Sequence, residues 1–201
     1  MRLIADALSC QRSGRTVFEG LSFRVEPGAS LLLTGRNGAG KSSLLLILAG
    51  LLEPAGGALR AEEGDPERSL AEQAHYVGHR DALKPSLTPL EALDFWQAML
   101  GPGRTQPEAA LERMGLGHAL DLPCGYLSAG QRKRLALARL LVSHRPLWLL
   151  DEPTAALDTA SQALFEGLVA EHLAAGGLAV AATHFPLAFP AATTLRIGSE
   201  A

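Results

Sequence analysis

The chain has 201 residues, which suits one compact α/β domain, and 47% of them are hydrophobic, enough for a buried core. Its 18 basic and 21 acidic residues give a net charge of −3, which argues against nucleic acid as a partner. No stretch reaches the roughly 20 apolar residues that span a bilayer, so direct membrane insertion is not expected. Cys10 and Cys124 match no metal spacing and are expected to be reduced thiols.

The first half of the chain alternates short apolar strands with helical segments. Strands are predicted over 21–26, 30–34 and 75–78, and helices over 41–51, 89–100 and 107–114. The segments 53–67 and 101–107 are rich in Ala, Pro and Gly, so they are predicted to be surface loops.

The second half continues the same alternation. Helices are predicted over 128–142 and 159–174, and strands over 147–150 and 178–182. The continuous apolar run over 147–150 is typical of a strand that is buried on both faces. Alternating strands and helices of this kind predict a largely parallel sheet covered by helices.

A glycine-rich segment follows the strand predicted over 30–34 and opens the next helix. It reads Gly35-Arg36-Asn37-Gly38-Ala39-Gly40-Lys41-Ser42 and fits the pattern G-x-x-x-x-G-K-[ST]. Its glycines let backbone N–H groups turn toward phosphate oxygens, and the helix N-terminus adds positive dipole character. We therefore predict a site for the phosphates of ATP. Lys41 would reach the β- and γ-phosphates, and the Ser42 hydroxyl would bind Mg²⁺.

Two adjacent carboxylates follow the apolar strand over 147–150. Asp151 is expected beside the phosphate loop, where it would hold Mg²⁺ directly or through water. Glu152 is the candidate that polarises the attacking water, since hydrolysis needs a water in line with the γ-phosphate. The alternative is an acidic pair that caps the following helix.

A second anion-binding helix start is predicted from Leu127-Ser128-Ala129-Gly130-Gln131. Ser128 can cap the helix that follows, and the small residues after it let backbone N–H groups approach an anion. A nucleotide held by Lys41 does not need this loop. We therefore expect it to close over ATP held by another copy of the chain.

The segments LSAGQRKRLALARLL and LWLLDEPTAALD, followed by a lone histidine, resemble the ATP-binding subunits of ABC transporters. The resemblance covers nearly the whole chain, although Ala129 stands where the signature usually has glycine. It implies a P-loop NTPase of the α/β class, with a mostly parallel central sheet and an antiparallel side sheet. It also implies a core over about 1–82 and 123–201, with a small helical subdomain over about 83–122.

The resemblance gives roles to further residues. It implies that Gly35 through Ser43 bind nucleotide and that Leu127 through Gln131 form a signature loop acting in trans. Asp158, in Ala156-Leu157-Asp158, would contact the partner subunit. His184 would contact the γ-phosphate and the water near Glu152, whereas taken alone it would be an ordinary histidine at a strand end.

Two positions depart from the family pattern. His79 stands where most ABC ATPases have a glutamine that touches Mg²⁺, and a shorter imidazole that titrates near neutrality puts this contact in doubt. Arg12 stands where an aromatic residue that stacks on adenine is expected. A guanidinium can also stack on a base, and the alternative is a solvated arginine.

These departures, with RNGAGKSSLL and YVGHRDALKPSLTPLEAL, resemble the subfamily of ABC ATPases that serves cytochrome c maturation. That resemblance implies membrane partners of the CcmB and CcmC type and a homodimer in the ATP-bound state. It places the chain at the cytoplasmic side of the bacterial inner membrane, held there by the membrane subunits. ATP hydrolysis would drive haem export or release of the haem-loaded chaperone CcmE.

Other interpretations remain open from the sequence. The segment 83–122 is the natural surface for a membrane partner, with the candidate residues Leu83, Leu87, Leu90 and Phe95, although such a stripe also suits a subdomain core. Rival functions are a different ABC exporter, a soluble ABC ATPase of DNA repair or translation, and a P-loop kinase. The soluble class usually carries two cassettes or long coiled-coil insertions, and the kinase class would give the LSAGQ loop no purpose.

Overall fold

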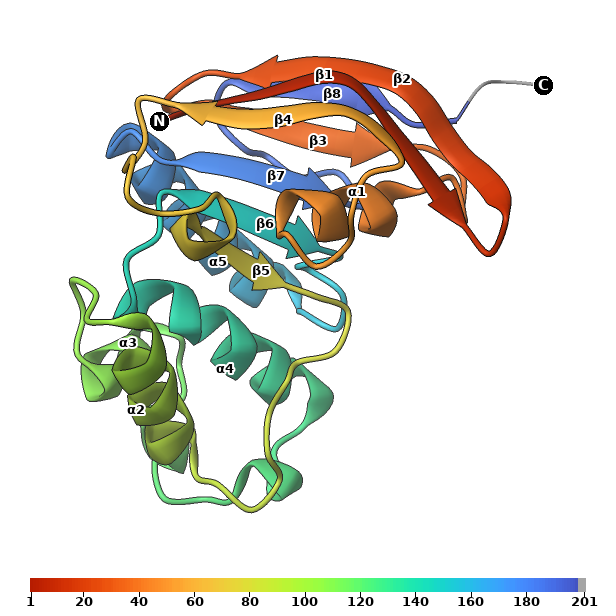
Figure 1. Cartoon of the computed structure of the whole chain (residues 1–201). Coiled ribbons are helices and arrows are strands. Elements are labelled where there is room, and N and C mark those ends of the chain that lie inside the picture. The colour runs from red at the N-terminus through yellow and green to blue at the C-terminus, as the bar shows by residue number, and fades with distance from the viewer. Residues whose placement is uncertain (199–201) are drawn as a thin grey trace. The chain divides into compact units, whose positions relative to one another are not determined.

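The computed structural model describes residues 1–198 and divides the chain into two compact units (Figure 1). The first unit holds Met1–Tyr76, Arg145–Glu152 and the chain from Val169 onward. The second unit holds Val77–His144 and Pro153–Leu168. These divisions differ from the expected helical subdomain over about 83–122, and the expected division into core and helical subdomain stays a prediction.

The first unit contains a three-stranded antiparallel sheet in the order β2-β1-β4. The strands are β1 (Arg2–Arg12), β2 (Arg15–Val25) and β4 (Gly56–Glu62). Ser13 and Gly14 join β1 to β2, and both have positive φ, at 49° and 75°. Two central residues with φ > 0 form the tight hairpin turn whose twist matches that of the flanking strands.

A five-stranded sheet has the order β5-β6-β7-β3-β8. Its strands are β3 (Ser30–Thr34), β5 (Ala74–Val77), β6 (Leu147–Asp151), β7 (Leu178–Ala182) and β8 (Ala192–Arg196). The pairs β3–β7, β3–β8 and β6–β7 are all parallel. Every residue of β6 and β7 is buried, which agrees with the continuous apolar sequence of a parallel strand that is covered on both faces.

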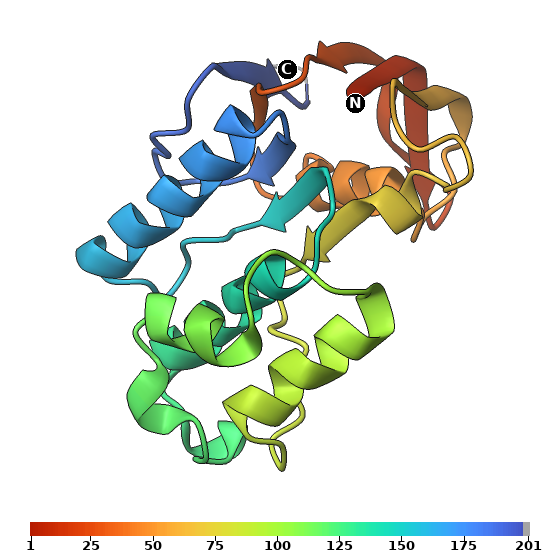
Figure 2. The same ribbon diagram turned by 90° about the vertical axis from the view of Figure 1, so that its left-hand side faces the viewer.

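The core of the first unit lies around α1 (Lys41–Leu48), which packs between the antiparallel and the parallel sheet (Figures 1 and 2). Leu44, Leu45 and Leu48 of this helix are fully buried. They pack in one cluster with residues of both sheets, such as Leu3 of β1 and Leu33 of β3. This apolar contact holds the start of α1 at a fixed place beside the end of β3.

The second unit is built from helices α2 (Pro89–Leu100), α3 (Pro107–Arg113) and α4 (Ala129–Val142), with the start of α5 (Thr159–Ala174). The helices α2, α3 and α4 all pack against one another. Arg139 of α4 lies over the Trp96 ring of α2, 4.9 Å from its centroid. Arg134 of α4 connects this helix to the end of α3, because it donates a hydrogen bond to the carbonyl of Met114, the C-cap residue of α3, at 2.9 Å. Short 3₁₀ turns lie at Ala71–Gln73, Gly117–Ala119 and Cys124–Tyr126.

Most predicted elements are confirmed, and one prediction is wrong. The elements over 30–34, 89–100, 159–174 and 178–182 have the predicted bounds. The segment 53–67 is not a loop throughout, because Gly56–Glu62 forms β4 and pairs with β1. Two further strands, β1 and β8, had no predicted counterpart.

Candidate functional site

The phosphate loop (Gly35–Ser42) connects β3 to α1 in the first unit. Gly40 is the N-cap residue of α1 with φ 107°, and no side chain caps the helix start. No acidic residue occupies the first helical turn. The backbone N–H groups of that turn therefore have neither a side-chain acceptor nor a competing negative charge, which is the arrangement that binds an anion.

Two glycines of this loop are required by close packing. A Cβ on Gly35 (φ 135°) would lie 2.3 Å from the Ile197 carbonyl oxygen. A Cβ on Gly40 would lie 2.5 Å from Val17 Cγ1 and 2.9 Å from Phe18 Cδ1. The start of the loop is therefore packed against the chain after β8, and its end is packed against β2. Neither contact is predictable from the sequence, because no local pattern marks Ile197, Val17 or Phe18 as neighbours of the loop.

Lys41 is 7% exposed, and its ammonium group lies within the loop. Its Nζ donates to the Gly35 carbonyl at 2.8 Å and to the Arg36 carbonyl at 3.1 Å. Ser42, the next residue, is exposed. Because carbonyl acceptors hold the lysine without neutralising it, a full positive charge remains for phosphate at this loop.

The carboxyl ends of β3, β6 and β7 lie level with one another. Ala182 of β7 is the register partner of both Leu33 in β3 and Asp151 in β6. Asp151 is 5% exposed, and within residues 1–198 its carboxylate has no hydrogen bond or ion pair. A buried carboxylate without a partner is costly, so the site suits a cation at this position.

Glu152 follows Asp151 and has an unusual backbone. Its φ of 48° is left-handed, although it is not glycine and precedes Pro153, and its N–H donates to the Ala182 carbonyl at 2.9 Å. Such a conformation costs about 1–3 kcal/mol and persists only where the surroundings enforce it. It directs the half-buried carboxylate of Glu152 toward the loop that follows β7.

His184 lies in that loop and contacts Glu152 twice. Its backbone N–H donates to Glu152 Oε2 at 3.4 Å, and its Nε2 lies 3.5 Å from Glu152 Oε1. Thr183 fixes the loop, because its hydroxyl donates to the Phe185 carbonyl and accepts from the Phe185 N–H, both at 2.9 Å. The phosphate loop, Asp151, Glu152 and His184 all belong to the first unit.

The signature loop (Leu127–Gln131) belongs to the second unit and begins α4. Ser128 caps the helix as predicted, since its Oγ accepts from the Gln131 N–H at 3.2 Å. Gln131 Oε1 accepts from the Ser128 N–H at 2.8 Å, which completes a capping box. The amide Nε2 of Gln131 lies 3.3 Å from His118 Nε2. The Ser128 hydroxyl proton is not used in the cap and can be donated to a ligand.

Asp158 caps α5, and the preceding turn contacts the signature loop within the second unit. Its Oδ1 accepts from the Ser161 N–H at 2.8 Å, and this backbone bond, followed by the Ser161 hydroxyl, lowers the pKa of Asp158. Ala156 has φ 67°, and a Cβ on Gly130 would lie 3.0 Å from the Ala156 carbonyl oxygen. The contact leaves little room for a larger residue at Gly130.

The two residues that depart from the family pattern are both exposed. His79 follows β5 in the second unit, and its ring has no hydrogen bond with any residue of the described chain. Arg12 ends β1 in the first unit, directly opposite Arg15 of β2. The Mg²⁺ contact of His79 and the base contact of Arg12 therefore stay predictions.

The candidate partner surface is only partly apolar. Leu83, Leu87 and Leu90 are half-buried, whereas Phe95 is 53% exposed. Met99, one helical turn further along α2, is also 53% exposed. Phe95 and Met99 therefore form the exposed apolar part of α2, and the leucines contribute mainly to the packing of the second unit.

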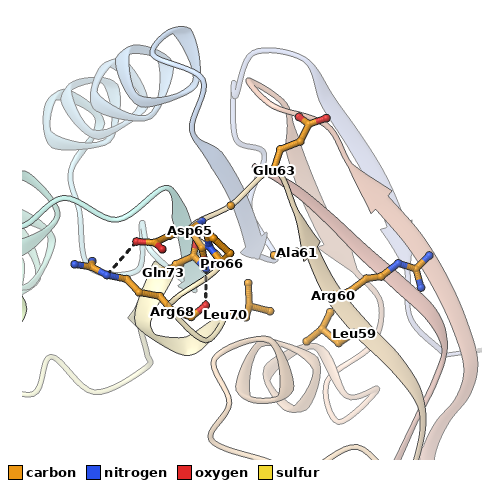
Figure 3. A pocket seen from close by; sticks show the side chains of 10 residues that line it. Leu59, Arg60, Ala61, Glu63, Asp65, Pro66, Arg68, Leu70 and Gln73 are labelled. Carbon is orange, nitrogen blue, oxygen red and sulfur yellow. Dashed lines mark hydrogen bonds and ion pairs between the residues drawn. The ribbon is translucent and has the colours of Figure 1, made fainter.

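A pocket of about 350 Å³ lies between β4 and the segment that leads to β5 (Figure 3). Gln73 closes it: its Oε1 accepts from the Asp65 N–H at 2.7 Å, and its Nε2 donates to the Arg68 carbonyl at 2.9 Å. Arg68 and Asp65 face each other in Figure 3, and their ion pair measures 3.3 Å. These polar groups bind one another, and no residue of the sequence motifs lines the pocket.

Within residues 1–198, no three His, Cys, Asp or Glu side chains gather in a way that could hold a metal ion. A metal at Ser42 and Asp151 would therefore take its other ligands from phosphate oxygens and water, which is how Mg²⁺ is usually held. Within the same range, no helix combines the length and apolar character needed to cross a bilayer.

The chain is similar to known proteins along its whole length. Residues 18–155 match the ABC transporter family. The chain is 56% identical to the cytochrome c biogenesis ATP-binding export protein CcmA of Rhodopseudomonas palustris (strain BisB5), with 100% of both chains covered. It is 53% identical to the CcmA protein of Bradyrhizobium diazoefficiens, again with 100% of both chains covered. A Pyrococcus furiosus structure assigned to ABC transporter ATP-binding proteins matches its fold with a TM-score of 0.84, at 22% identity over 98% of both chains.

Proposed function

Because the chain belongs to the ABC transporter family, we propose that it is the ATP-hydrolysing subunit of the haem-export system of cytochrome c biogenesis. The observation that carries this proposal is the sequence identity, above 50% over the full length of both chains, to relatives named cytochrome c biogenesis ATP-binding export proteins. A different ABC exporter is the second candidate, because the ATPase site itself contains no determinant of the exported substrate.

The proposed nucleotide site uses the phosphate loop. Its uncapped helix start and the Lys41 ammonium group bind the β- and γ-phosphates of ATP, and Gly35 through Ser43 surround them. Ser42 and Asp151 hold Mg²⁺, and the unpartnered carboxylate of Asp151 supports that role. Bound Mg²⁺ would supply neutralisation of the phosphate charge.

The proposed hydrolytic residues are Glu152 and His184. The strained backbone of Glu152 holds its carboxylate at the end of β6, where it would orient a water and accept its proton. His184 holds this carboxylate from one side through its backbone N–H and lies close enough with Nε2 to share the same water. His184 is also proposed to contact the γ-phosphate of ATP.

The signature loop is proposed to act on ATP held by a second copy of the chain. The capping box of Ser128 and Gln131 fixes the start of α4, and the exposed Ser128 hydroxyl remains able to donate. Asp158 would contact the partner copy. The working form is then a homodimer in the presence of ATP, with two sites made from both chains.

The chain is proposed to act at the cytoplasmic side of the bacterial inner membrane, held there by membrane subunits of the CcmB and CcmC type. The exposed Phe95 and Met99 of α2 support a contact with such a subunit. Exposed apolar side chains that gather on one surface mark interaction sites. Hydrolysis would be coupled to haem export or to release of the haem-loaded chaperone CcmE.

Co-purification from detergent-solubilised membranes tests the assignment. A tagged chain should retain membrane proteins of the CcmB and CcmC type, and recovery of another permease instead would favour the second candidate. The double variant Phe95→Ser/Met99→Ser should lose these partners while the purified chain keeps its ATPase rate. The matched control is Leu51→Ser, because Leu51 is 64% exposed but lies in the first unit. Equal losses in the control and the double variant would reject the α2 surface.

A further inference from the structure

A histidine outside the sequence motifs contacts the signature loop. His118 lies in the 3₁₀ turn Gly117–Ala119, between α3 and the signature loop in the second unit. Its Nε2 lies 3.3 Å from the amide Nε2 of Gln131, the last residue of the signature loop. His118 thus connects the segment after α3 to the loop that is proposed to bind ATP in trans.

The capping box determines how the Gln131 amide is oriented. Its Oε1 accepts from the Ser128 N–H at 2.8 Å, so the amide oxygen faces Ser128 and the NH₂ group faces His118. An amide NH₂ group only donates hydrogen bonds, so the Nε2 atom of His118 must be the acceptor. The contact therefore requires the neutral form of His118, with its proton on Nδ1.

Protonation of His118 is incompatible with this arrangement. The imidazolium ion has a donor on both ring nitrogens, so its Nε2–H would point at the NH₂ group of Gln131. Turning the amide over would offer the imidazolium an oxygen, but it would place the NH₂ group against the Ser128 N–H. The His118 cation and the Ser128 N–H thus compete for one amide oxygen, and the capping box depends on the charge of His118.

The side chains around this turn do not hold His118 in one charge state. His118 is exposed, and within residues 1–198 it has no ion pair. A Cβ on Gly117 would lie 2.1 Å from Glu112 Oε1, so a carboxylate lies beside the turn on the side of α3. On the side of α4, Arg134 donates to the Gly115 carbonyl at 3.2 Å. The other charged residues near the turn along these segments are Arg113, Asp121 and Arg132. Charges of both signs therefore surround His118.

Resting on the proposed trans contact of the signature loop, we propose that His118 is a positioning residue for Ser128 and that its protonation weakens the ATP-bound dimer. Neutral His118 holds the Gln131 amide in the orientation that completes the capping box. The box fixes the start of α4, from which the Ser128 hydroxyl donates to ATP of the other copy. The acceptor on His118 is present above neutral pH and is lost as the pH falls, because histidine ordinarily gains its charge between about pH 8 and 5.

Analytical ultracentrifugation of the full-length chain with ATP tests this role. Glu152→Gln serves as the parent, so that ATP persists during the measurement. His118→Gln keeps an acceptor that does not titrate, whereas His118→Lys only donates and stays charged. At about pH 8 the parent and His118→Gln should have equal dimer dissociation constants, and His118→Lys should dimerise roughly two- to tenfold more weakly, the range of one hydrogen bond.

The decisive comparison is made in acid. At about pH 5.5 the parent should dimerise as weakly as His118→Lys, roughly two- to tenfold below His118→Gln. The matched control is His144→Gln, since His144 is an exposed histidine beyond the opposite end of α4, and this variant should keep the pH response of the parent. His184 titrates in every variant, so the result lies in the difference between them. The same pH dependence in the parent and in His118→Gln would overturn the proposal.

Nitrogen NMR of the chain without nucleotide gives a second measurement that does not depend on dimerisation. At about pH 8 the His118 ring, assigned by its absence from His118→Gln, should carry its proton on Nδ1 and leave Nε2 unprotonated. A proton on Nε2 at that pH would also overturn the positioning role. If the parent forms no ATP-dependent dimer at either pH, the proposed trans contact fails and the role of His118 fails with it. A normal dimer with no difference between the parent and His118→Gln removes the role of His118 alone.

Discussion

The imidazole Nε2 of His184 lies 3.5 Å from Oε1 of Glu152, and the backbone N–H of His184 donates to the other carboxylate oxygen at 3.4 Å. One residue thus holds both oxygens of a carboxylate whose own backbone is in the left-handed region. Strain of this kind is maintained where a side chain must keep one direction. The pair lies at the level where the strands β3, β6 and β7 all end.

Glu152→Gln should abolish turnover without abolishing ATP binding. The amide keeps the size of the carboxylate but cannot accept a proton from water, so we expect the ATPase rate to fall by roughly 10²–10³-fold. ATP should then trap a dimer that is visible by size-exclusion chromatography. Turnover at the wild-type rate would reject Glu152 as the residue that activates water, and Lys41→Ala provides the control that loses ATP binding itself.

Ser128→Ala should affect both stability and turnover. Loss of the cap on α4 should lower the free energy of unfolding by about 1 kcal/mol, measured by denaturant titration. Thr88→Ala is the matched control, because Thr88 and Glu91 form the same capping box at the start of α2.

Both of these variants should lose similar stability, but only Ser128→Ala should lose ATPase activity under conditions where the chain is folded. That result would separate a role in nucleotide contact from a role in helix capping. Equal activity in the two variants would leave Ser128 with the capping role alone and remove the trans contact from the proposal.

Gly35→Ala should destabilise the first unit and disrupt the phosphate loop. Its positive φ already disfavours alanine by roughly 1–2 kcal/mol, and the new Cβ would also collide with the Ile197 carbonyl oxygen. Gly176→Ala is the control, since Gly176 has φ 85° but open space around its Cα. Thermal unfolding should show a clearly larger loss for Gly35→Ala, and similar losses would show that the contact with Ile197 is easily relieved.

Asp158 should contribute a pH-dependent part of the stability of the second unit. Its pKa is lowered from the usual 3.8 by the Ser161 N–H, so its stabilising effect is complete above that value. The effect is lost as the pH falls through the lowered pKa of the folded state. The stability difference between wild type and Asp158→Ala, followed by denaturant titration, should therefore shrink in acid and stay constant near neutrality.

Asp158→Asn separates capping from charge, because an amide oxygen still accepts the Ser161 N–H bond while the negative charge is gone. Near neutral pH this variant should keep most of the cap but lose any partner contact that needs the charge. ATP-dependent dimerisation measured for the Asn and Ala variants checks this. Dimerisation at the wild-type level in Asp158→Asn would exclude a charge-dependent contact.

The sequence by itself determined the elements whose causes are local. The helix over 89–100 begins at a capping box, and the strands over 147–150 and 178–182 are apolar throughout because parallel strands are buried on both faces. The phosphate loop was predictable for the same reason, since its glycines and lysine lie within eight consecutive residues. Strands with mixed polarity, such as β4, were missed because their pairing with β1 depends on residues far away in the chain.

Only the tertiary structure decided which distant groups meet. Ile197, which follows β8, approaches Gly35 of the phosphate loop, and Val17 of β2 approaches Gly40, and no local sequence pattern predicts either contact. The approach of His184 to Glu152 depends on the parallel register of β6 and β7 and on a strained backbone at Glu152. The hairpin register likewise decided that Arg12 faces Arg15. Contacts between segments far apart in the sequence come from packing and strand register. The sequence determines both, but no local pattern in it reveals which distant segments meet.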